Sequence, residues 1–293
     1  TFYLDGLKLI SCLCSKASDS IKASEFLACK GFSKQMKKGF LYPFFGGVFL
    51  DAKLETRSSL LTHYLRLFSR GQATLPEEGM AALPAALWKR LHKTELLLSQ
   101  EVVEIAEGFI TLKSGQLLKG DVVIVAVEGF SYPFKSSELS RVGYQKVKCL
   151  YFAIKSGLIQ PNPFLYLGSS GPILNLSILN HIQPSYAPSG YDLVSVSVVD
   201  PLWQSSNETL KVTLETLGSW FGVSQKCFEF LREYTIAHAL PSQRSAPPLQ
   251  GKCKVPGYKR VYLAGELACE ASINGALVSG RKAARASIGP ACA

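Results

Sequence analysis

The segment from Val261 to Ala284, VYLAGELACEASINGALVSGRKAA, holds the residues of this chain that are best suited to chemistry. An apolar, strand-like run ends at Gly265-Glu266, and a short loop then leads into a helix of mostly small residues. The start of that helix, Ile273-Asn274-Gly275, is expected to present free backbone N–H groups and a partial positive charge. Such a helix end can stabilise the negative charge that collects on an electron-accepting ring when the ring is reduced.

Two further features of this segment suit a flat cofactor. Glu266 would stand at the carboxyl end of a strand, where an acidic side chain can accept hydrogen bonds from sugar or ribityl hydroxyl groups. Small residues would let the helix approach a ring closely; they are Ser272, Gly275, Ala276, Ser279, Gly280, Ala283 and Ala284. The same residues also suit a helix that simply packs tightly on a sheet. On these residues alone, the two interpretations are equally good.

Motifs for other chemistries do not occur in the sequence. Gly275 to Lys282 differs from a phosphate-binding P-loop, because Arg281 follows the second glycine and no Ser or Thr follows Lys282. The sequence contains no GxSxG elbow, no HExxH pair and no Cys/His pair at the spacing of a catalytic dyad, so no motif supports a hydrolase. The eight cysteines form no CxxC pair and have no histidines at zinc spacing beside them. We therefore predict no metal site. The cysteines are expected to be free thiols in a reducing compartment inside the cell, of which the cytoplasm and the plastid are examples.

Composition indicates a folded globular protein, with 47% hydrophobic and 18% charged residues. The longest strongly apolar stretches, such as Val122 to Val127, are too short to span a bilayer. The formal net charge is +10, but the basic residues are scattered and no nucleic-acid motif accompanies them. We expect no nucleic-acid partner, whereas weak peripheral attraction to anionic membrane surfaces would follow from this charge.

The elements that must position the closing segment follow from hydrophobic periodicity and turn residues. Helices are expected at 21–30, at 56–68, within 75–91 and at 207–221, the last with Asn207 as its N-cap. The aromatic stretch 40–51 contains Pro43 and a glycine pair, which predicts a turn or a short extended segment. Strands are expected at 101–105, in a hairpin at 108–120, and at 121–127, 147–154, 173–179, 193–199 and 261–264.

Several of these segments resemble the flavin-containing amine oxidoreductases, a family that includes monoamine oxidases, protoporphyrinogen oxidase and phytoene-type desaturases. The closing segment is similar to the C-terminal flavin segment of that family. Asp19 to Ser59, with its GFS, PFF-GGVF and LET-SS elements, resembles the start of the substrate domain in desaturase-like members. Further similar stretches follow in the family's order: Leu75–Leu87, Glu101–Ile105, Val122–Ala126, Tyr186–Val199 and Ala237–Pro241. The likeness covers nearly the whole chain.

The resemblance implies FAD as the cofactor and assigns expected positions around it. Gly265 and Glu266 would lie at the pyrophosphate and the ribityl chain, and Val103 would contact the adenine side through its backbone. The isoalloxazine ring would lie near Ser272, Ile273, Asn274 and Ala276. The family more often has Asp where Glu266 stands, so the extra methylene would lengthen that contact. No catalytic side chain can be carried over, because the family's catalytic groups vary.

The fold that the resemblance implies is α/β, with an α+β substrate domain and the C-terminal part of a Rossmann-type FAD-binding domain. Residues 1–70 and 129–254 would form the substrate domain, and residues 71–128 and 255–293 the FAD-binding domain. No two glycines in the chain are separated by one residue, so the G-x-G-x-x-G fingerprint is absent. We therefore expect a chain truncated at its N-terminus that lacks the first βαβ unit.

The expected activity is FAD-dependent removal of two electrons from a C–N or C–C bond of a small lipophilic substrate. In such enzymes the cofactor does the chemistry, and the protein orients the substrate and tunes the ring. The alternative is a non-catalytic remnant that serves as a binding or scaffold module. The sequence does not identify the substrate, the electron acceptor or the oligomeric state.

Overall fold

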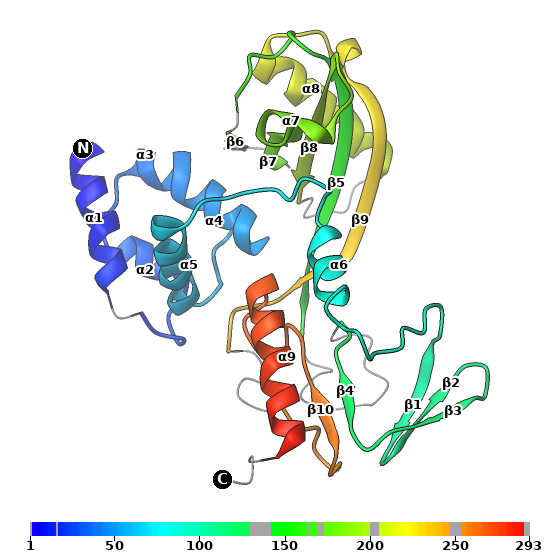
Figure 1. The fold of residues 1–293 in the computed structure, drawn as a ribbon. Coiled ribbons are helices and arrows are strands. Elements are labelled where there is room, and N and C mark those ends of the chain that lie inside the picture. The colour runs from blue at the N-terminus through cyan, green and yellow to red at the C-terminus, as the bar shows by residue number, and fades with distance from the viewer. Residues whose placement is uncertain are drawn as a thin grey trace. The chain divides into compact units, whose positions relative to one another are not determined.

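The computed structural model describes residues 2–15, 17–128, 142–162, 164–168, 173–199, 205–246 and 253–289. The chain forms two compact units, each built from two separate stretches of sequence. The first unit comprises Thr1–His92 and Gln145–Ala239, and the second comprises Lys93–Tyr144 and Leu240–Ala293. Figure 1 shows the elements of both units coloured along the chain.

Helices form the first stretch of the first unit. They are α1 (Phe2–Cys14), α2 (Ala23–Cys29), α3 (Lys34–Met36), the π-helical turn η1 (Lys37–Leu41), α4 (Tyr42–Phe49), α5 (Ser58–Arg70) and α6 (Ala82–Trp88). The predicted helices at 21–30, at 56–68 and within 75–91 are confirmed with slightly different ends. Their shared core contains the buried side chains of Leu27, Phe45, Phe49 and Leu61.

The prediction of a turn or extended segment at 40–51 is wrong, because these residues continue a helix into α4. Pro43 lies in the first turn of α4, where its missing N–H costs no hydrogen bond. The two glycines of α4 differ in how closely other residues approach them. A Cβ atom at Gly47 would lie 2.7 Å from Asn175 Nδ2, and one at Gly46 would lie 3.4 Å from the Cα of Ala52. Gly47 therefore marks close packing inside a helix, whereas Gly46 is in ordinary van der Waals contact, and the packing of α4 overrides the low helix propensity of both.

A five-stranded sheet forms most of the rest of the first unit, with the strand order β6-β7-β8-β5-β9. The strands are β5 (Tyr144–Lys155), β6 (Leu165–Leu167), β7 (Ile173–Ile178), β8 (Tyr191–Val198) and β9 (Glu229–Pro241). The pairs β6–β7, β7–β8 and β5–β8 are antiparallel. Short helical turns connect them: α7 (Leu179–Ile182), η3 (Pro184–Tyr186) and η4 (Gln225–Cys227). The predicted strands at 147–154, 173–179 and 193–199 are confirmed.

Helix α8 (Ser206–Phe221) packs its apolar side chains against one face of this sheet. The prediction that Asn207 caps this helix is wrong, because the N-cap is Ser205. The Ser205 hydroxyl accepts from the Glu208 N–H at 3.4 Å, and the Glu208 carboxylate accepts from the Ser205 N–H at 3.3 Å. This reciprocal capping box satisfies two backbone donors at once, which a lone Asn cap does not do.

The second unit contains two small sheets and one helix. Strands β1 (Val102–Ala106), β2 (Phe109–Leu112) and β3 (Leu117–Lys119) form an antiparallel sheet in that order. Strand β4 (Val123–Val125) pairs in parallel with β10 (Val261–Leu263), and α9 (Ile273–Ile288) lies beside β10 (Figure 1). Buried side chains from both sheets share one core, which includes Ile105, Val125, Val261 and Leu263.

The boundaries between the units differ from the expected domain boundaries at 70/71, 128/129 and 254/255. The chain changes unit at 92/93, 144/145 and 239/240. Residues 71–92 stay with the first unit because the hydroxyl of Tyr186 donates to the Pro76 carbonyl at 2.7 Å. The Ser242 N–H donates to the Gly143 carbonyl at 2.7 Å, which holds that stretch in the second unit. The assignment of the units to substrate and FAD binding stays a prediction.

Candidate functional site

The connection from β10 to α9 contains most of the residues that the sequence assigned to a cofactor. Gly265 follows the strand with φ of +121°, a backbone conformation that only glycine adopts without strain. Its N–H donates to the hydroxyl of Ser279 at 2.7 Å, and Ser279 is a buried residue of α9. This hydrogen bond fixes the turn after the strand against the helix that follows it.

Ser272 is the N-cap of α9, and its side chain accepts a hydrogen bond from the Gly275 N–H at 2.9 Å. The Ser272 carbonyl accepts from the Ala276 N–H at 2.9 Å. Within the residues that the structure describes, the N–H groups of Ile273 and Asn274 donate to no protein acceptor. Both residues are exposed. The positive end of the helix dipole therefore presents two free donors to a ligand.

Gly275 is required by the close approach of the preceding loop. A Cβ atom at this position would lie 1.9 Å from the carbonyl oxygen of Glu270, which is far inside van der Waals contact. Gly280 lies further along the same helix, and a Cβ atom there would meet nothing within 4 Å. The two glycines of this helix thus differ: the first allows the loop to fold over the helix start, and the second is not needed for packing.

The structure brings six of the seven predicted cofactor residues into this one connection. They are Gly265, Glu266, Ser272, Ile273, Asn274 and Ala276. Glu266 is half-buried directly after the glycine turn, and Ala276 is exposed on the first turn of α9. Free amide donors, an exposed small residue and a nearby carboxylate are the groups that a flavin ring and its ribityl chain require. The residues present therefore fit the implied cofactor.

The seventh predicted residue, Val103, lies on β1 in the other sheet of the second unit. The register of β1 against β2 shifts between Val102 and Glu104, so Val103 stands at a bulge. Bulges interrupt the strand ladder and free backbone groups for other contacts. Ile105 of the same strand shares a core with Leu267 of the β10–α9 connection. This placement leaves the backbone of Val103 outside the regular ladder between β1 and β2.

Sequence reasoning missed Ser279, which holds the glycine turn through the hydrogen bond from Gly265. A signal for it existed, because Ser272, Ala276, Ser279 and Ala283 are small residues at helical spacing. Ser279 and Ala283 are buried, as expected for the helix face that packs on the sheet. Size alone places Ser279 with the other small residues of the helix, although its hydroxyl gives it a distinct role.

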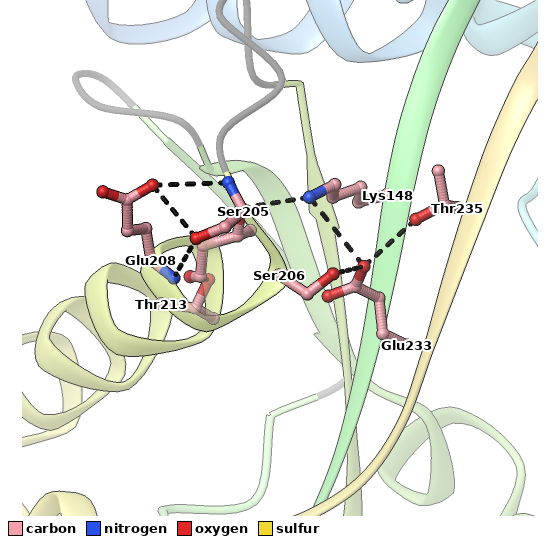
Figure 2. Close-up of polar contacts among 8 residues, drawn as sticks. Lys148, Ser205, Ser206, Glu208, Thr213, Glu233 and Thr235 are labelled. Atoms are coloured by element: carbon pink, nitrogen blue, oxygen red, sulfur yellow. Dashed lines mark hydrogen bonds and ion pairs between the residues drawn. The ribbon is translucent and has the colours of Figure 1, made fainter.

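A second polar cluster lies in the first unit, where β5, α8 and β9 meet (Figure 2). The ammonium group of Lys148 lies 3.8 Å from Glu233 Oε1 and donates to Thr209 Oγ1 at 3.3 Å. The hydroxyls of Ser206 and Thr235 donate to the same Glu233 oxygen at 2.9 and 3.0 Å. The Lys148 side chain is only 5% exposed and that of Glu233 13%. A buried charge with these partners holds the start of α8 to two strands.

The face of the sheet opposite α8 carries Tyr151 and Tyr234, whose rings meet edge-on with centroids 5.9 Å apart. Cys149 Sγ lies 3.8 Å from Ser195 Oγ on the neighbouring strand. Burial is the main cause that raises the pKa of the Tyr151 phenol, and its hydrogen bond with Cys149 adds to the rise. The phenol therefore loses its proton at a higher pH than an ordinary tyrosine does.

Two other kinds of feature are absent from the described part of the chain. Among these residues, no group of three or more His, Cys, Asp or Glu side chains is placed to hold a metal ion. None of the helices in the described ranges has both the length and the apolar character that a membrane crossing demands.

Comparison with known proteins identifies the type of fold. The family model described as flavin-containing amine oxidoreductase matches residues 15–288.

Solved structures with a similar fold come from several organisms. An oxidoreductase from Methanosarcina mazei matches at 16% identity with a TM-score of 0.78, over 96% of this chain and 71% of that one. A Pyrococcus furiosus protein matches at 16% identity and TM-score 0.72, over 97% and 72%. Reduced UDP-galactopyranose mutase matches at 12% identity and TM-score 0.59, over 89% and 66%. No curated protein matches. The predicted α/β flavoprotein fold is confirmed.

Proposed function

This chain belongs to the flavin-containing amine oxidoreductase family, whose cofactor is FAD. We propose that it catalyses the oxidation of an apolar small molecule. The reaction would remove two electrons from a C–N or C–C bond of that molecule. When bound, FAD supplies the electron acceptor, and the residues of this chain orient the ring and stabilise its charge.

The start of α9 is the observation that carries this proposal. The free N–H groups of Ile273 and Asn274 would face the part of the ring where negative charge develops. Ser272 would keep these donors in place by capping the helix through the Gly275 N–H. Because the donors are fixed before a ligand arrives, little energy would be spent on rearranging them.

Glu266 and Val103 have proposed roles further along the cofactor. Glu266 follows the strand end and would accept hydrogen bonds from ribityl hydroxyl groups. Val103, at the bulge of β1, would use its backbone to contact the adenine side. The proposed apolar substrate is supported by exposed apolar side chains along β9 in the first unit, which are Phe230, Leu231, Tyr234 and Ile236.

We further propose that firm binding of FAD needs a G-x-G-x-x-G unit in addition to these residues. No two glycines of this sequence have the required spacing. Strand β10 is flanked by β4 on one side and bridged by Lys254 on the other. The outer edge of β4 has no strand partner in the described part of the chain, and Ile124 on it is 40% exposed. Since parallel sheets are normally larger and covered, this edge suits a further strand.

A binding or scaffold module without catalysis is the second candidate function. The same open edge of β4 and the same absence of a phosphate-binding fingerprint favour it. The two candidates differ in what they predict for the cofactor: an enzyme must hold a flavin that substrate can reduce, whereas a scaffold need not bind one.

Reconstitution with FAD distinguishes these candidates. The protein is produced in cells supplied with riboflavin, both as this chain and with a G-x-G-x-x-G unit supplied on a second polypeptide. An enzyme would retain flavin absorbance near ~450 nm, and amines or lipophilic alkenes would bleach it under anaerobic conditions. A folded but colourless protein in both preparations, with no flavin retained after gel filtration, would favour the scaffold.

A further inference from the structure

A hollow of about 520 Å³ lies in the first unit, away from the β10–α9 connection in sequence. Helical residues from α3, η1 and α4 form one side, and residues at the start of β7 form another. The residues that matter most in its lining are Lys34, Lys37, Lys38, Pro43, Ile173 and Leu174. Its volume is in the range of small-molecule sites, which is about 300 to 1,000 Å³.

Three lysines line the hollow, and none of the described lining residues carries a negative charge to compensate them. Lys34 and Lys38 are four residues apart, and Lys37 lies between them on the same stretch of helix. In the described residues, none of their ammonium groups forms an ion pair or a hydrogen bond. Of the described residues that line the hollow, none is acidic. Like charges at this spacing destabilise a helix, so an anion in the hollow would relieve a repulsion that the protein leaves in place.

The opposite side of the hollow is apolar. Ile173 is 2% exposed and Leu174 is 9% exposed, so both are firmly held by the sheet and offer little surface of their own. The accessible apolar lining consists of Tyr42, Pro43 and Ala52. Pro43, in the first turn of α4, adds a rigid apolar surface beside them. A ligand that only carried charge would gain nothing from this wall, whereas an apolar group would be removed from water there.

The backbone that carries the lysines is fixed at both ends. Ser33 caps the helix, because its hydroxyl accepts from the Met36 N–H at 3.0 Å. The buried carboxylate of Asp5 in turn accepts from the Ser33 N–H at 3.0 Å and from its hydroxyl. At the other end, the wide turn η1 closes with a hydrogen bond from the Tyr42 N–H to the Lys37 carbonyl. Such π-helical turns often occur at functional sites.

An ordinary solvated helix face would also carry lysines, but it would present them to open water with acidic neighbours nearby. Here three of them line one cavity whose other wall is apolar and whose described lining lacks a carboxylate. We propose that this hollow binds the anionic end of an apolar molecule, a carboxylate or a phosphate attached to a hydrocarbon chain or ring. Lysine suits either group, because its ammonium acts as a mobile point charge.

Binding of matched dodecyl compounds to the 293-residue chain tests the proposal by isothermal titration calorimetry below their micelle concentrations. Dodecanoate and dodecyl phosphate should both bind, and dodecanol and dodecyltrimethylammonium should bind much more weakly. The triple variant K34Q/K37Q/K38Q should bind the two anionic compounds about tenfold more weakly, which is about 1.4 kcal/mol. Affinity should also fall as salt concentration rises, because salt screens exposed charges.

The matched control is K89Q/K211Q/K226Q, which removes the same charge from exposed lysines elsewhere and should bind like the unchanged chain. Ala52→Trp fills the hollow from an exposed lining position and should weaken binding of both anionic compounds without changing charge. Circular dichroism checks that each variant is folded.

Three results would overturn the proposal: dodecanol binding as tightly as dodecanoate, inorganic phosphate binding as tightly as dodecyl phosphate, or equal weakening in both triple variants. Preference between dodecanoate and dodecyl phosphate tells which anionic group the site takes. None of these measurements involves flavin, so their failure would leave the proposed oxidoreductase function untouched.

Discussion

The five-stranded sheet of the first unit and the two-stranded parallel sheet of the second unit are stabilised to very different extents. Strand β5 runs for 12 residues, and Phe152 and Leu176 of the first sheet are fully buried beneath α8. Strands β4 and β10 pair over only three residues each, and Ile124 remains exposed. A sheet of two short strands is marginal on its own.

The larger sheet and the residues assigned to the cofactor therefore lie in different units. The residues assigned to the flavin lie in the unit with the smaller sheets, on the connection after β10 and at the bulge of β1. The larger core lies in the unit that carries the lysine-lined hollow and the exposed apolar side chains of β9. Stability and cofactor binding therefore depend on different residues, and substitutions can separate them.

The largest effect is expected from Glu233→Gln in the first unit. The substitution removes the carboxylate charge that lies 3.8 Å from the Lys148 ammonium group, and Lys148 is only 5% exposed, so the loss of one charge of this buried pair is costly. We expect the free energy of unfolding to fall by about 3 kcal/mol, measured by urea denaturation followed by circular dichroism.

The control for this substitution is Glu101→Gln in the second unit. Glu101 pairs with Lys113 at 2.6 Å, but both side chains are more than half exposed. Exposed ion pairs contribute little, so no measurable change is expected. Equal losses in the two variants would contradict the burial that distinguishes these pairs.

The next effect concerns the two glycines of α9, which should respond in opposite directions. Gly275→Ala puts a Cβ atom 1.9 Å from the Glu270 carbonyl oxygen and should destabilise the second unit by about 2 kcal/mol. Gly280→Ala meets nothing within 4 Å and should stabilise the helix by up to about 1 kcal/mol. Amide hydrogen exchange within α9 measures both changes, and a stabilising Gly275→Ala would contradict the packing of that loop.

A smaller loss is expected from Ser272→Ala, which removes the side-chain acceptor of the Gly275 N–H. N-cap substitutions of this kind cost about 1 kcal/mol. Ser287→Ala serves as its control, because the Ser287 hydroxyl bonds only a carbonyl of the last turn of α9. Faster exchange of the amides of the first turn in Ser272→Ala, but not in Ser287→Ala, is the expected result.

The smallest effect is a pH dependence of the first unit that comes from Tyr151. Burial raises the pKa of Tyr151 above its ordinary value, so at alkaline pH the folded phenol keeps a proton that the unfolded chain has lost. Stability should therefore decline as pH rises above the ordinary tyrosine pKa of about 10. Tyr151→Phe should reduce that decline in urea denaturation at high pH. The control Tyr191→Phe, at an exposed tyrosine, should leave it in place.

Local patterns predicted most of the elements correctly. The alternation of Val194, Val196 and Val198 with serines predicted β8, and the small residues after Ile273 predicted α9. Patterns failed where tertiary contacts decide. Helix α4 contains Pro43 and two glycines, which locally indicate a turn, and the approach of Asn175 to Gly47 is not visible in the local sequence.

Other features depended on partners distant in sequence. The Tyr186–Pro76 hydrogen bond joins residues 110 positions apart and sets a unit boundary that composition does not reveal. Of the candidate site, the turn at Gly265 and the helix start were predictable because they are local. The Lys148–Glu233 pair was missed, although a lysine in the core-facing register of β5 was a visible signal.

The most direct test of the central claim is amide NMR of the isotope-labelled chain during titration with FMN, FAD and ADP. The account predicts that FMN and FAD shift the Ile273 and Asn274 amide signals even if binding is weak, whereas ADP alone does not. Gly275→Ala should abolish these shifts and Gly280→Ala should keep them. Unchanged Ile273 and Asn274 signals at saturating FAD, or shifts confined to the first unit, would contradict the account.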